Sequence, residues 1–263
     1  IGQNVFSIGQ RLSSPEIGML ASLGMNLAPV YRKLKVAIFS TGNEVQAPGT
    51  PASESHIFDS NRYTLMGLLV HLGCETIDLG IIEDDEQSMV NALNNASQSA
   101  DVVLTSGGVS VGDADFIKSA LESLGTIEFW RINMRPGRPL AFGKINNTPI
   151  FGLPGNPVAV MVSFINFVEP ALRKMQGEVN WNPLKVPAVA TEDLRSRQGR
   201  TEFTRGIYSF NERGQVIVKS TGKQGSGILR SMSEANCLIE ISPAVDTVKV
   251  GESVTIIPLQ GRI

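Results

Sequence analysis

The sequence is poor in the two side chains that most often carry metal or nucleophilic chemistry. Its 263 residues include two histidines, His56 and His71, and two cysteines, Cys74 and Cys237. These numbers exclude a three-histidine metal site, a four-cysteine zinc site and a disulfide scaffold, and they suit a reducing compartment. Neither histidine has a nucleophile motif beside it, and both cysteines lie next to apolar runs. We therefore assign all four to structural roles.

The sequence also lacks an excess of charge and a long hydrophobic run. Lys and Arg number 23 against 25 Asp and Glu, a net charge of −2, which disfavours a nonspecific binder of nucleic acid or membrane surfaces. The most apolar stretch, 158–168, contains Ser163 and Asn166 and is too short to span a bilayer. We expect no nucleic-acid partner, no membrane span and a cytoplasmic location. Carboxylates, basic side chains and backbone amides are left to carry any catalysis.

Glycine and proline are present in excess and are clustered. The 26 glycines and 14 prolines exceed the usual combined share of about 12%. They gather in residues 107–112, 136–139 and 152–157, and each group follows an apolar run. This pattern indicates turns at the ends of strands and not a low-complexity segment.

From residue 34 to residue 178, short apolar runs alternate with amphipathic segments. Strands joined through helices in this way form right-handed βαβ units. We therefore predict an α/β domain over residues 34–178, with a mostly parallel sheet and helices on both faces. The predicted strands are 36–39, 76–82, 102–105, 127–132, 140–142 and 150–151, and the predicted helices are 59–72, one that begins at Asp84, 116–124 and 157–175.

The two flanking segments have a different pattern. Residues 179–263 contain short runs rich in β-branched residues between turn signals, which predicts a small all-β domain. Residues 1–33 hold one short helical pattern, 15–23, with Ser14 as its N-cap, and we expect them to be a strap from a lobe outside this chain. The predicted strands of the β-rich domain are 186–190, 203–210, 216–219, 238–241 and 254–257.

Three carboxylates each follow a predicted strand, namely Glu44, Asp84 and Asp115. Ligands of doubly wound sheets bind beyond the carboxyl ends of the strands, where three such groups suit a hard cation. The alternative roles are a helix N-cap for Asp84 and a first-turn position for Asp115. Asp59 is equally consistent with capping of the helix that follows it.

A glycine- and serine-rich loop, Thr105–Gly112, lies between a predicted strand and a helix. Free amides and helix polarity favour a phosphate in such a loop. The loop is neither a Walker loop nor a dinucleotide fingerprint, and the alternative is a tight turn. Arg131, Arg135 and Arg138 follow a later strand and can clamp an anion through forked hydrogen bonds, or else be solvated surface charges.

Five ordered segments together resemble the molybdopterin molybdenumtransferase family, which includes the C-terminal enzymatic domain of gephyrin. The similarity continues through GRTEFTRG at 199–206 and through 225–238, so it covers nearly all of the chain from about residue 20. The fold it implies is of the molybdopterin-binding type. The five segments are FSTGNE at 39–44, DSNR at 59–62, LGIIEDD at 79–85, TSGGVSVGDAD at 105–115 and GLPGNP at 152–157.

The resemblance implies the last step of molybdenum cofactor synthesis. In that step molybdate is inserted into molybdopterin while an adenylylated pterin is hydrolysed, assisted by a divalent cation, usually magnesium. Members of the family form homodimers in which an additional N-terminal lobe helps to close the partner's site, and contact with the molybdopterin adenylyltransferase is a further possibility. Because that lobe is not in this sequence, we expect the chain to be part of a polypeptide of about 400 residues.

The resemblance also implies roles for particular residues. Glu44, Asp84 and Asp115 would place the metal or molybdate, and the family often has lysine where this chain has arginine. A change from lysine to arginine keeps the charge but alters the hydrogen-bond geometry. The residues implied to bind the pterin are Thr105, Ser106, Gly107, Gly108, Ser110, Gly112 and Asp113 in the loop, Arg131, Arg135 and Arg138 as basic groups, and Pro154, Asn156 and Pro157 in the adjoining wall.

Two other functions stay open at this point. The molybdopterin adenylyltransferase is similar over residues 105–112, but it is usually a single α/β domain, so residues 183–263 argue against it. A noncatalytic scaffold of the gephyrin kind is the other alternative, since fold resemblance does not by itself establish function.

Overall fold

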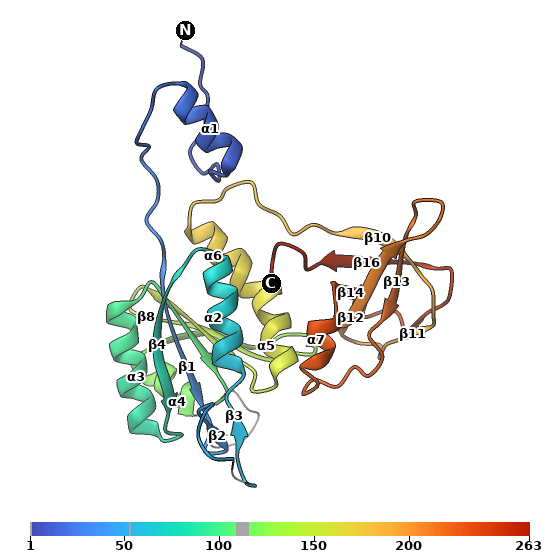
Figure 1. The fold of residues 1–263 in the computed structure, drawn as a ribbon. Coiled ribbons are helices and arrows are strands. Elements are labelled where there is room, and N and C mark those ends of the chain that lie inside the picture. The colour runs from blue at the N-terminus through green and yellow to red at the C-terminus, as the bar shows by residue number, and fades with distance from the viewer. Residues whose placement is uncertain (1, 53, 109–115) are drawn as a thin grey trace.

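The computed structural model describes residues 2–52, 54–108 and 116–263. Its first sheet has six strands in the order β4-β1-β5-β9-β8-β6 (Figure 1). The first four of these run parallel, and the last two join through antiparallel pairings, so the predicted mostly parallel sheet is confirmed. The strands are β1 (Lys35–Thr41), β4 (Glu75–Ile82), β5 (Val102–Ser106), β6 (Gly125–Arg131), β8 (Pro139–Ile145) and β9 (Thr148–Leu153).

Helices cover both faces of this sheet because its central strand is apolar on both sides. Val36 and Ile38 of β1 pack into one core cluster with α2, α5 and α6, whereas Ala37 and Phe39 pack into another with α3 and α4. Successive side chains of a strand point to opposite faces, which explains the division. In the described parts of the chain, no helix is both long and apolar enough to cross a membrane. The helices are α2 (Asn61–His71), α3 (Glu86–Ser99), α4 (Phe116–Leu124), α5 (Pro157–Ser163) and α6 (Glu169–Met175).

The second sheet closes on itself as a barrel. Its order is β13-β10-β16-β14-β12-β7, and an additional pairing of β12 with β13 joins the ring. All five strands predicted after residue 179 are present. The structure adds β7 (Met134–Arg135), which follows β6 in the chain and pairs with β12, where Met134 lies opposite Thr201. The barrel strands are β10 (Val186–Ala190), β12 (Thr201–Phe210), β13 (Val216–Ser220), β14 (Cys237–Ile241) and β16 (Ser253–Pro258), and the short elements are β2 (Val45–Gln46), β3 (Ile57–Phe58), β11 (Leu194–Arg195), β15 (Thr247–Val248) and α7 (Arg230–Glu234).

One long helix lies between the sheet and the barrel (Figure 1). The sequence predicts a single helix over 157–175, and the structure interrupts it with a π-helical turn, η1 (Phe164–Val168), between α5 and α6. Val158, Val162 and Ile165 pack against Leu238 and Ile257 of the barrel. The helix is therefore a wall shared by the two parts of the chain.

Two predicted helix starts are wrong by one residue. Helix α3 is capped by Asp85, whose carboxylate accepts a hydrogen bond from the Ser88 amide at 3.0 Å, and not by Asp84. Helix α1 (Ser14–Ser22) has Ser13 as its N-cap, because the Ser13 amide donates to the Glu16 carboxylate. In each case two neighbouring residues have side chains that can cap a helix, and the N-cap is the extended residue that directly precedes the helix.

The segment before β1 is attached to the sheet by a bidentate ion pair. Arg32 donates to both carboxylate oxygens of Asp101 at 2.6 Å, and the Lys35 amide donates to the same group. Hydrogen bonding from Arg32 holds the pKa of Asp101 below its usual value. Helix α1 itself projects beyond the sheet and buries none of its residues (Figure 1).

Strand β5, which lies beside β1, gives a direct test of this packing. Leu104 on β5 is fully buried, so Leu104→Ala should lower the free energy of unfolding by about 2–5 kcal/mol through lost burial and an unfilled cavity. Leu184→Ala, the same change at an exposed position of the linker, should stay within about 0.5 kcal/mol. Urea denaturation measures both variants, and equal losses in the two would contradict the assignment of the core.

Candidate functional site

The carboxyl ends of the four parallel strands bring polar segments to one edge of the sheet. Residues 42–44 follow β1, 83–85 follow β4, 107–108 follow β5 and 154–156 follow β9. Strand β6 runs in the same direction as β9, because each is antiparallel to β8, so Arg131 ends at this edge as well. These described segments thus end at the edge where ligands of doubly wound sheets bind.

The turn after β5 lies so close to β1 and α4 that only glycine fits there. Gly107 and Gly108 have φ values of 89° and 66°, a region that costs other residues free energy. A Cβ on Gly107 would lie 2.4 Å from the Thr41 carbonyl oxygen, and one on Gly108 would lie 2.8 Å from the Ile117 side chain. The Gly107 amide donates to the Leu153 carbonyl at 3.2 Å, which joins this turn to the end of β9.

The remainder of the predicted loop is only partly described. Thr105 and Ser106 are buried at the end of β5. Pro154 is buried, whereas Asn156 is exposed and Pro157 half-buried at the start of α5. Four predicted site residues lie outside the described residues, namely Ser110, Gly112, Asp113 and Asp115.

Asn61 ties two of the site loops together. Its side-chain Nδ2 donates to Ser106 Oγ at 2.8 Å and to the Gly155 carbonyl at 2.7 Å. Its Oδ1 is buried and has no hydrogen-bond partner among the described residues. The sequence indicated only a helix cap and a family motif at residues 59–62, and Asn61 was not predicted as a site residue. The available signal was its position, at the first residue of a helix that begins beside the strand ends.

The acidic residues separate into two groups with different roles. Asp84 accepts a hydrogen bond from Thr41 Oγ1 at 3.1 Å, which directs its carboxylate toward the end of β1. Asp59 is buried, where it accepts from Ser40 and caps α2 through the Arg62 amide while it pairs with the Arg62 guanidinium at 2.9 Å. Asp59 is therefore structural, as its capping position indicated, whereas Asp84 is not a cap.

The donors at this edge suit magnesium. Glu44 and Asp84 supply hard oxygen ligands, and Mg²⁺ is commonly held by one or two carboxylates together with water and substrate phosphate. Within residues 2–52, 54–108 and 116–263, no three side chains of His, Cys, Asp or Glu form a group that could hold a metal by themselves. A magnesium site here would therefore need Asp115 or oxygens of the substrate.

The three arginines lie in one connection, between β6 and β8. Arg131 and Arg138 are exposed and Arg135 is half-buried on β7. Gly137 brings the connection against α5, because a Cβ there would lie 2.6 Å from Ser163 Oγ. Among the ion pairs of the described residues, none involves these guanidinium groups. Their positive charge at the edge of the site is therefore not neutralised by an ion pair within the described residues.

The two cysteine thiols are buried. Burial raises the pKa of Cys74 to about 11 and that of Cys237 to about 12. Both thiols are thus protonated at neutral pH and poorly nucleophilic. His71 is also structural, since its ring Nε2 lies 2.7 Å from the Gly261 carbonyl oxygen. The structural roles expected for these three residues are confirmed.

Comparison with known proteins identifies the family. Residues 37–174 match the family model described as "Probable molybdopterin binding domain", and residues 187–259 match "MoeA C-terminal region (domain IV)". The chain belongs to the family of proteins that contain this molybdopterin-binding domain. The relatives of this family include the molybdopterin molybdenumtransferase of Haemophilus influenzae, 44% identical over 258 residues, and that of Nostoc sp., 34% identical over 263 residues.

The match extends over nearly all of this chain but over less than two thirds of each relative. The alignments cover 98% of the chain in both cases, against 64% of the Haemophilus protein and 60% of the Nostoc protein. A molybdopterin biosynthesis MoeA protein from Pyrococcus horikoshii has the same fold, with a TM-score of 0.80 and 32% sequence identity. The superposition covers 98% of this chain and 62% of that one. The chain therefore spans less than two thirds of the length of these family members.

The bridge made by Asn61 can be tested in this family member. Asn61→Ala removes two hydrogen bonds between the β5 and β9 loops, so the free energy of unfolding should fall by about 1–2 kcal/mol. Asn95→Ala, the same change at an exposed position of α3, is the matched control. Amide exchange should also rise at Ser106 and Gly155 in the first variant only. If the two variants behave alike in denaturation and exchange, Asn61 does not hold the loops together.

Proposed function

We propose that the protein is a molybdopterin molybdenumtransferase. It inserts molybdate into adenylylated molybdopterin with hydrolysis of the adenylate, and so forms molybdenum cofactor. The observation that carries this proposal is the convergence at one edge of a glycine turn, the Asp84 carboxylate and the arginine-bearing connection. The names of the relatives support it, since the Haemophilus and Nostoc proteins are both molybdopterin molybdenumtransferases.

In this proposal the loop after β5 binds the pterin's phosphate. The Gly108 amide and the amides that follow it donate to the phosphate, with Thr105, Ser106, Gly107, Ser110, Gly112 and Asp113 forming the loop. Arg131, Arg135 and Arg138 offset the negative charge of phosphate and molybdate through forked hydrogen bonds. Pro154, Asn156 and Pro157 form the wall beside the loop, held to it by Asn61.

Three carboxylates act on the cation and the substrate oxyanions. Glu44, Asp84 and Asp115 would hold magnesium, which supplies charge neutralisation at the phosphate and the oxyanion. Thr41 fixes the orientation of Asp84 by donating to it. No histidine base is required, because the groups at this edge position the reactants and stabilise charge.

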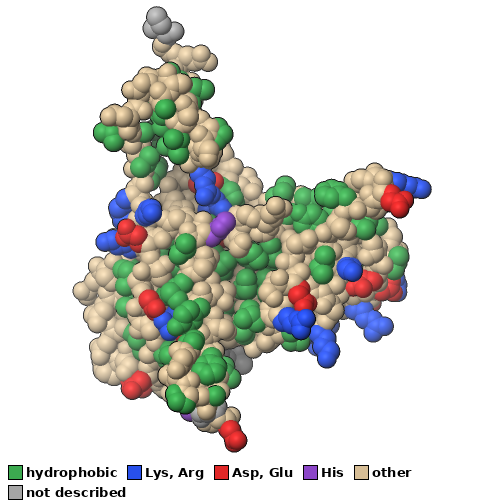
Figure 2. All heavy atoms as spheres, in the orientation of Figure 1, with side chains coloured by type: hydrophobic (Ala, Val, Ile, Leu, Met, Phe, Trp, Pro, Cys, Tyr) green, Lys and Arg blue, Asp and Glu red, His purple; other side chains and the backbone are tan. Residues whose placement is uncertain are grey.

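We also propose the wider organisation that the family resemblance implies. Residues 1–33 would be a strap, 34–178 the molybdopterin-binding domain and 179–263 the C-terminal domain of a cytoplasmic homodimer, with contact to the molybdopterin adenylyltransferase. The exposed apolar side chains of the strap support a covering lobe or subunit, as Ile17 is 61% and Leu27 82% exposed. Figure 2 shows such side chains over the projecting α1 region.

The alternatives differ in measurable ways. The barrel, which residues 186–258 form together with β7, argues against a molybdopterin adenylyltransferase of the single-domain kind. A noncatalytic scaffold would bind neither molybdopterin nor molybdate in the presence of magnesium, whereas the enzyme binds both.

Removal of the acidic groups tests the proposal. In the full-length protein, Glu44→Gln and Asp84→Asn should each lower molybdate-dependent cofactor formation from adenylylated molybdopterin by about a hundredfold or more. Glu212→Gln, in the exposed turn between β12 and β13, should leave it unchanged. Undiminished activity in both site variants would remove the carboxylates from the mechanism, and inactive wild-type protein that binds no pterin would favour the scaffold.

A further inference from the structure

The shared helix has a break in its backbone hydrogen bonds. The Glu169 amide donates to the Phe164 carbonyl, five residues back, and not to Ile165. The next amide in the chain that could serve Ile165 belongs to Pro170, which has no N–H. The Ile165 carbonyl therefore needs a donor from outside the helix, since buried carbonyls are seldom left unpaired.

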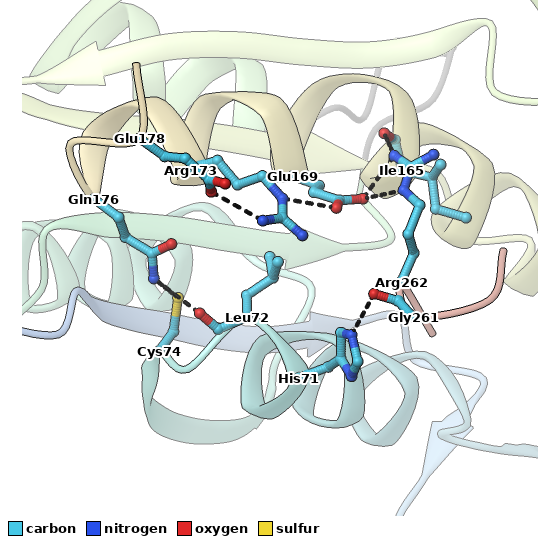
Figure 3. Close-up of polar contacts among 10 residues, drawn as sticks. All are labelled: His71, Leu72, Cys74, Ile165, Glu169, Arg173, Gln176, Glu178, Gly261 and Arg262. Atoms are coloured by element: carbon cyan, nitrogen blue, oxygen red, sulfur yellow. Dashed lines mark hydrogen bonds and ion pairs between the residues drawn. The ribbon is translucent and has the colours of Figure 1, made fainter. Parts of the chain in front are cut away.

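Arg262, in the segment after β16, supplies that donor. Its Nη2 donates to the Ile165 carbonyl at 2.9 Å and to the Glu169 carboxylate at 2.7 Å, and its Nε donates to the same carboxylate at 3.0 Å. Figure 3 shows the guanidinium between these two groups. Glu169 is 1% exposed and Arg262 8% exposed, so the contact is shielded from water and from salt.

A second arginine, Arg173 of α6, and the linker between α6 and β10 also contact this ion pair. Arg173 donates to the other oxygen of Glu169 at 2.9 Å and to Glu178 at 2.9 Å. The Trp181 ring lies under both guanidinium groups, 4.7 Å from that of Arg173 and 5.5 Å from that of Arg262. Cation–π contacts of this kind favour a desolvated arginine. Glu169 thus has one arginine from its own helix and one from the far end of the barrel.

The same helix begins at the candidate site. The amide of Val158, in its first turn, donates to the Ser226 carbonyl of the barrel at 3.1 Å. The barrel therefore holds this helix at two separated places, at Val158 beside the site and at Ile165 and Glu169 in its middle. Apolar packing of the barrel against α5 and η1 fills the space between the two.

We propose that Arg262 is a clasp that sets the position of the barrel on the shared helix. By occupying the gap at the π-helical turn, it fixes the register of the barrel along the helix and with it the contact of Ser226 with Val158 at the edge of the site. The inference concerns the joint between the two parts of the chain, and it holds whichever reaction takes place at that edge.

Amide exchange in the full-length protein tests the clasp. Arg262→Met leaves Glu169 with one buried partner and Ile165 without its donor, so exchange should rise at least about tenfold in residues 165–169 and also at Val158. Arg230→Met is the matched control, because Arg230 forms an exposed ion pair with Glu234 in the same barrel, and it should change neither region. Faster exchange in residues 165–169 without a change at Val158 would overturn the proposal, since Arg262 would then act only locally.

A conservative variant keeps the test decisive in case Arg262→Met does not fold. Arg262→Lys keeps the positive charge beside Glu169, but its ammonium ends one bond short of the guanidinium nitrogen that reaches Ile165. We expect it to fold and to show faster exchange at Val158 than wild type. If Arg262→Met does not fold, wild-type exchange at Val158 in Arg262→Lys would contradict the clasp.

Discussion

The parallel pairing of β1 with both β4 and β5 is the constraint on which the rest of the structure depends. It sets Ser40 opposite Ser106 and Thr41 opposite Ile82. Thr41 then meets both neighbours, through its hydroxyl at Asp84 and through its carbonyl at the Gly107 turn. A slip of one residue would exchange the two faces of β1 and move these groups apart. The site is thus a consequence of strand register as much as of the residues that line it.

The second constraint is the wall that the sheet and the barrel share. The helix of residues 157–175 carries apolar side chains into the barrel on one side and covers the sheet with others. Its first turn borders the site and contacts Ser226, while its π-helical turn contacts Arg262. The pairing of β7 with β12 adds a backbone link between the two parts. The barrel and the strand-end edge are therefore joined by continuous contacts through this helix.

Much of the fold could be predicted from the sequence because it depends on local patterns. The apolar run of residues 36–39 in β1 and the apolar positions of α2 and α3 indicated the strands, the helices and the coverage of both faces of the sheet. The glycine turn after β5 was visible because Gly107 and Gly108 follow a strand directly. Asp85 was missed as the N-cap of α3 because Asp84 and Asp85 are adjacent, and either carboxylate could cap a helix that begins after it.

What escaped prediction depends on contacts between distant residues. Asn61 is 45 positions from Ser106 and 94 from Gly155, and Arg262 is 93 from Glu169. No local periodicity reports such pairs, since they form only when the sheet and the barrel are in place. The π-helical turn was missed for a similar reason. A proline near the end of an apolar helix is compatible with a plain end or kink, and only the nearby arginine shows how the open carbonyl is satisfied.

The central claim is that the edge formed by the ends of β1, β4, β5 and β9 binds the phosphate of a pterin. The most direct measurement is a crystal structure of the full-length protein with adenylylated molybdopterin. We expect a phosphate oxygen about 3 Å from the Gly108 amide nitrogen, with the arginine-bearing connection on its other side. A pterin phosphate bound elsewhere, with the Gly107–Gly108 turn making no contact to it, would show that this edge is not the phosphate site.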